Sequence, residues 1–114
     1  MKQEVTKIMR MIDEIGTYFL HNYAATRFDV HLERRDDAFQ ARCIVSPVAI
    51  EQGAYDELER WLKQKRNPEI EEYYWQLTGE AEDSSELALV AMMSDVIDME
   101  YDGEVLTIDM TRKI

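Results

Sequence analysis

Apolar residues recur at steps of three and four over the first part of the chain, from Lys2 to Tyr23. The stripe consists of Val5, Ile8, Met9, Ile12, Ile15, Phe19 and Tyr23. This spacing places the stripe on one side of a helix, so the sequence predicts a long amphipathic helix over 2–23. Gly16 lowers the local helix propensity by up to about 1 kcal/mol. A glycine inside a packed helix usually marks close approach by another part of the chain.

Strict alternation of apolar and polar residues follows a short corner at 24–26. The alternating apolar residues are Phe28, Val30 and Leu32, and then Phe39, Ala41, Cys43 and Val45. If Leu32 pairs with Phe39, both apolar sets share one face of a hairpin. We therefore predict two antiparallel strands, with residue 30 opposite 41 and residue 28 opposite 43.

Two helices are predicted in the middle of the chain. Ser46-Pro47 ends the second strand, because proline cannot donate to a strand ladder. A first stripe, running to Lys65, comprises Tyr55, Leu58, Trp61 and Leu62. Asn67-Pro68-Glu69 then signals a new helix start with asparagine as the N-cap, and Thr78-Gly79 signals its end. The stripe of this second helix comprises Ile70, Tyr73, Tyr74 and Leu77.

Aromatic residues gather in this second helix as Tyr73-Tyr74-Trp75. A stacking platform for nucleic-acid bases is one interpretation of such a cluster. Platforms of that kind combine aromatic rings with a positively charged groove. Because no basic residue accompanies these three rings, core packing is the favoured interpretation.

The last part of the chain predicts a buried helix and a second hairpin. Asp83 to Glu86 resembles a helix cap, and the apolar run 87–93 predicts the most buried helix. Asp102-Gly103 between alternating segments is a strong hairpin signal, and it predicts residue 101 opposite 104, 99 opposite 106 and 97 opposite 108. The predicted fold is α+β in a single domain, 1–114. It is a two-layer sandwich in which helices cover one face of a mostly antiparallel four-stranded sheet.

The net charge of −11 is concentrated in the second half of the chain. Residues 1–45 carry seven basic and seven acidic residues, whereas residues 46–114 carry six and seventeen. Such a surface repels phosphate backbones and anionic lipids, so neither a nucleic acid nor a membrane is expected as a partner. Two interpretations remain open for the acidic surface: a solvated face that maintains solubility, and a docking face for a basic protein partner.

Residues with recognisable site chemistry are few. The single cysteine, Cys43, cannot form an internal disulfide, and its place in a strand fits a buried thiol in a reducing cytoplasm. His31 is expected to face solvent from a strand and His21 to lie at a helix end. Neither histidine has a cysteine or carboxylate at ligand spacing, so no metal site is predicted. There is no nucleophile–base pair and no Walker-type loop, so we assign no catalytic residue and no cofactor.

Membrane insertion and secretion are not expected either. No apolar run approaches the roughly 20 residues that span a bilayer. The first residues lack the continuous apolar stretch of a signal peptide. The sequence therefore favours a cytoplasmic location.

Two segments, 14–46 and 87–114, resemble the histidine kinase-like ATPase (GHKL) family, and most closely its anti-sigma factor serine kinases. The first segment has the family's order of helix, short corner and two strands, and the second has its closing helix and hairpin. Together they cover about half of the chain. The resemblance implies that family's α+β fold and an ancestral nucleotide site.

The residues that carry nucleotide chemistry in that family differ here. Its first helix supplies a glutamate and, four residues on, an asparagine that holds Mg²⁺; here Glu14 fits, but Tyr18 cannot supply an amide oxygen. An aspartate and glycines that contact adenine are replaced by Ser-Pro-Val-Ala-Ile at 46–50. A glycine-rich phosphate turn is replaced by a segment, 81–86, with three carboxylates and no glycine.

Three hypotheses about function follow. The first is a non-catalytic regulatory module that binds a protein and has lost its ATP site. The second is an enzyme, a divergent ATP-binding serine kinase or ATPase of the anti-sigma type that retains Glu14 as a base. The third is an assembly module whose first helix and sheet form a homodimer.

Overall fold

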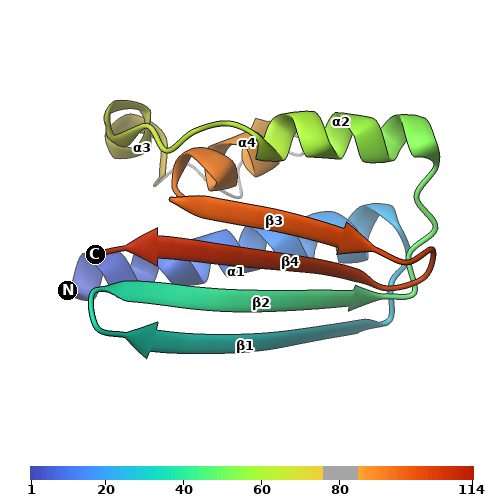
Figure 1. Cartoon of the computed structure of the whole chain (residues 1–114), viewed down its shortest axis with the longest axis horizontal. Helices are drawn as coiled ribbons and strands as arrows, with labels where there is room; N and C mark the ends of the chain where they lie inside the picture. Colours follow the sequence, from blue (N-terminus) through green and yellow to red (C-terminus); the bar gives the residue numbers. More distant parts are fainter. Residues whose placement is uncertain (76–84) are drawn as a thin grey trace.

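The computed structural model describes residues 1–75 and 85–114, which form four helices and four strands. The helices are α1 (Lys2–Asn22), α2 (Gln52–Leu62), α3 (Pro68–Tyr74) and α4 (Ser85–Met92). The strands are β1 (Arg27–Arg35), β2 (Ala38–Ser46), β3 (Val96–Tyr101) and β4 (Leu106–Lys113). They form one sheet in the order β1-β2-β4-β3, with every neighbouring pair antiparallel (Figure 1). The predicted α+β class and four-stranded antiparallel sheet are confirmed.

One face of the sheet is buried and the other is open to solvent. The buried face carries Phe39, Ala41, Cys43, Val45, Leu106, Ile108, Met110 and Arg112. Figure 1 shows α1 behind the sheet, and α4 packs against α1, α2 and α3. The helices therefore cover one face of the sheet, as the alternating strand patterns predict.

The long first helix and the corner after it agree with the sequence. Gly16 is buried, and a Cβ atom placed there would lie 2.6 Å from Cε2 of Phe28 on β1. The missing side chain lets α1 approach β1 closely, which is the role expected of this glycine. The chain then turns through Ala24, which has a positive φ of 53°.

The first hairpin has a different register from the predicted one. Leu32 lies opposite Ala41 and Val30 opposite Cys43, so the observed pairing is shifted by two residues. The two residues Asp36 and Asp37 connect the strands, and Asp36 adopts a positive φ of 48°. A two-residue shift leaves every side chain on its face, so the hydrophobic pattern does not distinguish the two registers. The tighter turn adds backbone pairs at the end of the ladder.

The second hairpin is also shifted by two residues, because its loop is longer than a two-residue Asp-Gly turn. Tyr101 pairs with Leu106 and Met99 with Ile108. The Asp102 carboxylate accepts hydrogen bonds from the N–H groups of Glu104 at 2.9 Å and Val105 at 2.7 Å. Gly103 supplies a positive φ of 99°. The Asp102 side chain thus satisfies the loop amides and favours the longer connection.

Helix α2 ends at Leu62 rather than at Lys65, and the residues that follow Lys65 have partners in other parts of the fold. Arg66 forms an ion pair with Asp95 at 2.7 Å. The backbone N–H of Asn67 donates to the carbonyl of Met92 at 2.8 Å. Asn67 also accepts a hydrogen bond from the N–H of Ile70, which confirms it as the N-cap of α3.

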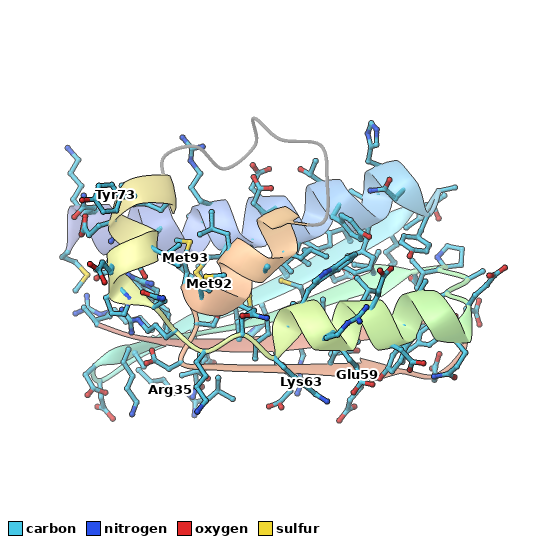
Figure 2. All side chains as sticks on the ribbon, turned by 90° about the horizontal axis from the view of Figure 1, so that it is seen from above. Arg35, Glu59, Lys63, Tyr73, Met92 and Met93 are labelled. Atoms are coloured by element: carbon cyan, nitrogen blue, oxygen red, sulfur yellow. The ribbon has the colours of Figure 1, made fainter. Side chains whose placement is uncertain are left out.

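The expectation that Tyr73 packs in the core is wrong. Glu71 and Trp75, one helical turn apart, are both buried, so Tyr73 lies on the opposite face of α3. Its side chain is 76% exposed, and Figure 2 labels it on α3. Trp75 is a core residue, as predicted.

Helix α4 fits the expectation of a buried helix. Leu87, Val90 and Ala91 have no exposed surface. The predicted cap at Asp83, the stripe residue Leu77 and the expected helix end at Thr78-Gly79 lie outside the described residues.

Candidate functional site

The C-terminal half of α1 carries the two residues that the family resemblance singles out, Glu14 and Tyr18. Glu14 is buried on the same flank of α1 as Tyr18, one turn earlier. Tyr18, Phe19 and Tyr23 form an aromatic cluster, with ring centroids 5.0 to 6.2 Å apart. Burial, and then the neighbouring Tyr23 and Glu57, raise the pKa of Tyr18 to about 12. Tyr18 is thus a neutral, packed phenol at physiological pH.

The segment after β2, residues 47–50, is held against the end of β3 by Tyr101. Val48 and Ile50 are buried. The Tyr101 hydroxyl donates to the carbonyl of Val48 at 2.9 Å and accepts from the N–H of Ile50 at 3.0 Å. Tyr55 of α2 stacks on Tyr101 with centroids 6.0 Å apart. These contacts use the backbone and the apolar side chains of this segment for packing.

A group of charged side chains, here called the buried ion cluster, joins α1, α3 and β4. It consists of the buried Lys7, Glu71 and Arg112 and, at their margin, the more exposed Glu4, Arg66 and Asp95. Glu71 is at its centre: Arg112 donates to both carboxylate oxygens, at 2.7 and 2.8 Å, and Lys7 donates to one of them at 2.6 Å. Arg112 also donates to Glu4 at 2.9 Å and to the carbonyl of Met93 at 2.7 Å.

The buried ion cluster as defined contains three bases and three acids, and the exposed Glu72 also lies 3.8 Å from the Lys7 ammonium. Burial alone would raise the pKa of Glu71, but hydrogen bonds from Arg112 and Lys7 outweigh burial and lower it to about 2. The Lys7 ammonium also lies 5.4 Å from the centre of the Trp75 ring, within cation–π range. This network of ion pairs links α1, α3 and β4, and we assign it a structural role.

Sequence reasoning did not find this cluster. Its central contacts join residues 64 and 41 positions apart. One local signal was Glu71 itself, a carboxylate that shares a helix face with Trp75. Arg112, at a core position of an alternating strand, was the corresponding signal in β4.

The open face of the sheet carries a polar groove of about 410 Å³ over β1, β2 and β4. Strand pairing places His31, Arg42, Asp109 and Asp98 in one row across the four strands. Arg42 donates to Asp109 at 2.8 Å, and His31 lies 3.1 Å from Glu33. His31 is exposed on its strand and His21 is exposed in the last turn of α1, as both were predicted.

Acidic residues collect on the β3 side of this open face. Asp98 and Glu100 are exposed on β3, and Asp102 and Glu104 are exposed in the loop that follows. Asp98 lies directly opposite another carboxylate, Asp109, in the β3–β4 ladder. We call Asp98, Glu100, Asp102 and Glu104 the acidic edge.

Cys43 is a core residue, as expected. Its thiol is buried, and burial followed by the nearby Asp109 raises its pKa to about 12. A thiol with so high a pKa is a poor nucleophile at neutral pH.

Within residues 1–75 and 85–114, no three metal-binding side chains are grouped closely enough to hold an ion. In the same part of the chain, no helix combines the length and apolar character needed to cross a membrane. A scan against protein-family models, and searches of curated proteins and of solved structures, found no match to this chain.

Proposed function

We propose that this chain is a non-catalytic, regulatory protein-binding module of the cytoplasm. In this proposal it is built on the histidine kinase-like ATPase scaffold of the anti-sigma factor kinases and has lost its ATP site. The observation that carries the proposal is Tyr18. It occupies the place of the Mg²⁺-binding amide, and it is packed into an aromatic cluster with a pKa of about 12.

The segment 46–50 supports the same proposal. In the family this stretch contacts the adenine base, and it needs a free carboxylate and small residues. Here Val48 and Ile50 are core residues, and Tyr101 binds the backbone on both sides of Ala49. A nucleotide base would have to displace this packing.

The partner that best fits the surface is a basic segment of another protein. The acidic edge presents four exposed carboxylates, two on β3 and two in the loop that follows it. Only Asp102 of these is engaged by its own loop amides. Lysine and arginine side chains of a partner would neutralise the Asp98–Asp109 juxtaposition and gain charge-assisted hydrogen bonds.

Nucleotide titration tests the first half of the proposal. Isothermal titration with ATP and Mg²⁺, up to millimolar nucleotide, is expected to give no saturable heat. Any saturable heat contradicts a lost site. If that heat disappears in a folded Glu14→Gln variant, the alternative is favoured, namely a divergent ATP-binding kinase or ATPase that uses Glu14.

Site-specific crosslinking tests the second half. A photoreactive residue in place of Glu100 is expected to capture a protein through a lysine- or arginine-rich segment, and capture should weaken as salt rises. The same residue in place of Asp13, which is exposed on α1, is the control for nonspecific capture. Equal capture at both positions contradicts a docking role for the acidic edge.

Matched charge variants then test whether partner binding depends on the acidic edge or only on the net charge of the protein. Asp98→Asn/Glu100→Gln and Asp13→Asn/Glu69→Gln each remove two negative charges. We expect partner binding to fall only in the first variant. Equal losses in both would mean that net charge alone attracts the partner.

A further inference from the structure

The outer edge of β1 is a long strand edge without a partner among the described residues. β1 has nine residues, and all nine pair with β2 in an unbroken ladder without a bulge. On its other side the sheet ends. An edge of this length offers backbone N–H and C=O groups to another strand.

An apolar strip runs beside this edge. Val30 on β1 is 41% exposed, although it belongs to the sheet face that the helices cover. On α1, Val5, Met9, Gly16 and Leu20 follow one another at steps of four, seven and four, so they lie on one flank of the helix. Gly16 contacts Phe28, so this flank faces β1 at the level of Gly16. Val5, Met9 and Leu20 are each 40% exposed or more.

We propose that this edge binds a second copy of the chain, with β1 pairing antiparallel to β1 of that copy about a two-fold axis at Val30. This proposal does not depend on the partner of the acidic edge. In this register, Val30 meets Val30 of the second copy, and Phe28 meets its Leu32. On the open face, Arg27 meets the second copy's Glu33, and Asp29 meets its His31. Both faces of the new ladder are therefore complementary.

Neighbouring registers are less favourable. A two-residue shift that brings the full length of β1 into pairing places Arg27 opposite Arg35 and Asp29 opposite Glu33, which are like charges. The next shift in that direction places Val30 opposite Arg34, a charge on the apolar side. Because like charges directly opposite each other destabilise a sheet, the register about Val30 is selected.

The other sheet edge, β3, is unsuited to self-pairing. Its open-face charges are Asp98 and Glu100, so any antiparallel self-pairing that keeps the faces matched brings carboxylates together or leaves them unpaired. β3 also has six residues rather than nine. In contrast, β1 lies in residues 1–45, where basic and acidic residues are equal in number. A two-fold contact at β1 thus keeps the acidic halves of the two copies apart.

Cysteine trapping tests the register. Residues directly opposite in an antiparallel pair have Cα atoms about 4.5 to 5.5 Å apart, which is within disulfide range. Val30→Cys is expected to give a disulfide-linked dimer on mild oxidation of the full chain. Val96→Cys, a more exposed valine on the β3 edge, is the matched control and should remain monomeric on a denaturing gel. The buried native Cys43 does not interfere.

Sedimentation with charge variants tests the pairing itself. Arg27→Glu is expected to weaken dimerisation roughly tenfold or more, and the double variant Arg27→Glu/Glu33→Arg should restore it. Val30→Lys should yield monomers, whereas Val96→Lys should leave the dimer intact, with circular dichroism confirming that each variant folds. A wild type that remains monomeric at high concentration overturns the proposal, as does equal crosslinking at positions 30 and 96. A monomer that instead binds an extended peptide along β1 assigns the edge to a different partner.

Discussion

Both carboxylate oxygens of Glu71 are engaged inside the protein, and this determines how α3 is placed. Arg112 binds the two oxygens as a fork and Lys7 adds a third hydrogen bond. A buried ion pair often contributes little net stability relative to apolar residues, but removing one member leaves the others buried without a counter-charge. The inward direction of Glu71 also explains why Tyr73 faces solvent.

Glu71→Gln is therefore expected to be strongly destabilising. It leaves Lys7 and Arg112 buried with less compensation, which typically costs about 3–5 kcal/mol of unfolding free energy. Glu72→Gln is the matched control. The Glu72 carboxylate lies 3.8 Å from the same Lys7 ammonium, but its side chain is 67% exposed. That change should cost less than about 1 kcal/mol. Urea unfolding measures both, and equal effects would contradict a central role for Glu71.

The contribution of Glu71 to the unfolding free energy should be lost at acidic pH. Its folded-state pKa is about 2, below the usual value of 4.5. A lowered carboxyl pKa means that the folded protein favours the ionised form, so the contribution is present above pH 4.5 and is lost as the pH falls towards 2. Unfolding free energies across this window should fall more steeply for wild type than for Glu71→Gln. Parallel curves would assign the acid sensitivity to other carboxylates.

At the level of elements, the type and order of the segments followed from hydrophobic periodicity. Neither hairpin register could be predicted in this way. In each hairpin a shift by two residues preserves which side chains are buried. The choice was made by loop chemistry: Asp36 with a positive φ in one turn, and the Asp102 carboxylate on loop amides in the other. Patterns of burial carry no information about that choice.

The same limit applies to the candidate sites: features that depend on neighbouring residues could be predicted, and contacts between distant residues could not. The helix cap at Asn67 and the close contact at Gly16 could be predicted from the sequence, because each prediction depends on a few neighbouring residues. The link between Lys7, Glu71 and Arg112 could not, because it requires knowing how three separate elements pack. Tyr73 was misplaced for that same reason.

The close crossing of α1 over β1 yields an element-scale prediction. Gly16→Ala adds a methyl group 2.6 Å from Phe28, so it should lower stability despite the better helix propensity of alanine. Gly53→Ala in α2 meets no atom within 4 Å and should raise stability by up to about 1 kcal/mol. Thermal melting of the two variants should thus give shifts of opposite sign. A stabilising Gly16→Ala would mean that the Phe28 ring yields without cost.

At the scale of the whole molecule, the two edges of the sheet differ in charge and in exposed apolar surface. The β1 side carries alternating charges beside exposed apolar residues, whereas the β3 side carries carboxylates with few bases. Asp98 faces Asp109, and the one described base that contacts this pair is Arg42, which donates to Asp109. A surface that repels itself in this way is costly to the fold, and it becomes favourable when a cation binds.

Asp98→Asn should therefore stabilise the isolated protein while weakening its binding to a basic partner. Removing one of two directly opposed carboxylates is expected to raise the unfolding free energy by roughly 0.2–1 kcal/mol. That gain should shrink as salt screens the repulsion. Glu69→Gln is the control: this residue lies in the first turn of α3, where a negative charge favours the helix dipole, so its loss should be neutral or slightly destabilising. Thermal melts at low and high salt, combined with partner-binding measurements, separate the two effects. If Asp98→Asn lowered the melting temperature at low salt, Asp98 would be a structural residue and the acidic edge would need another explanation.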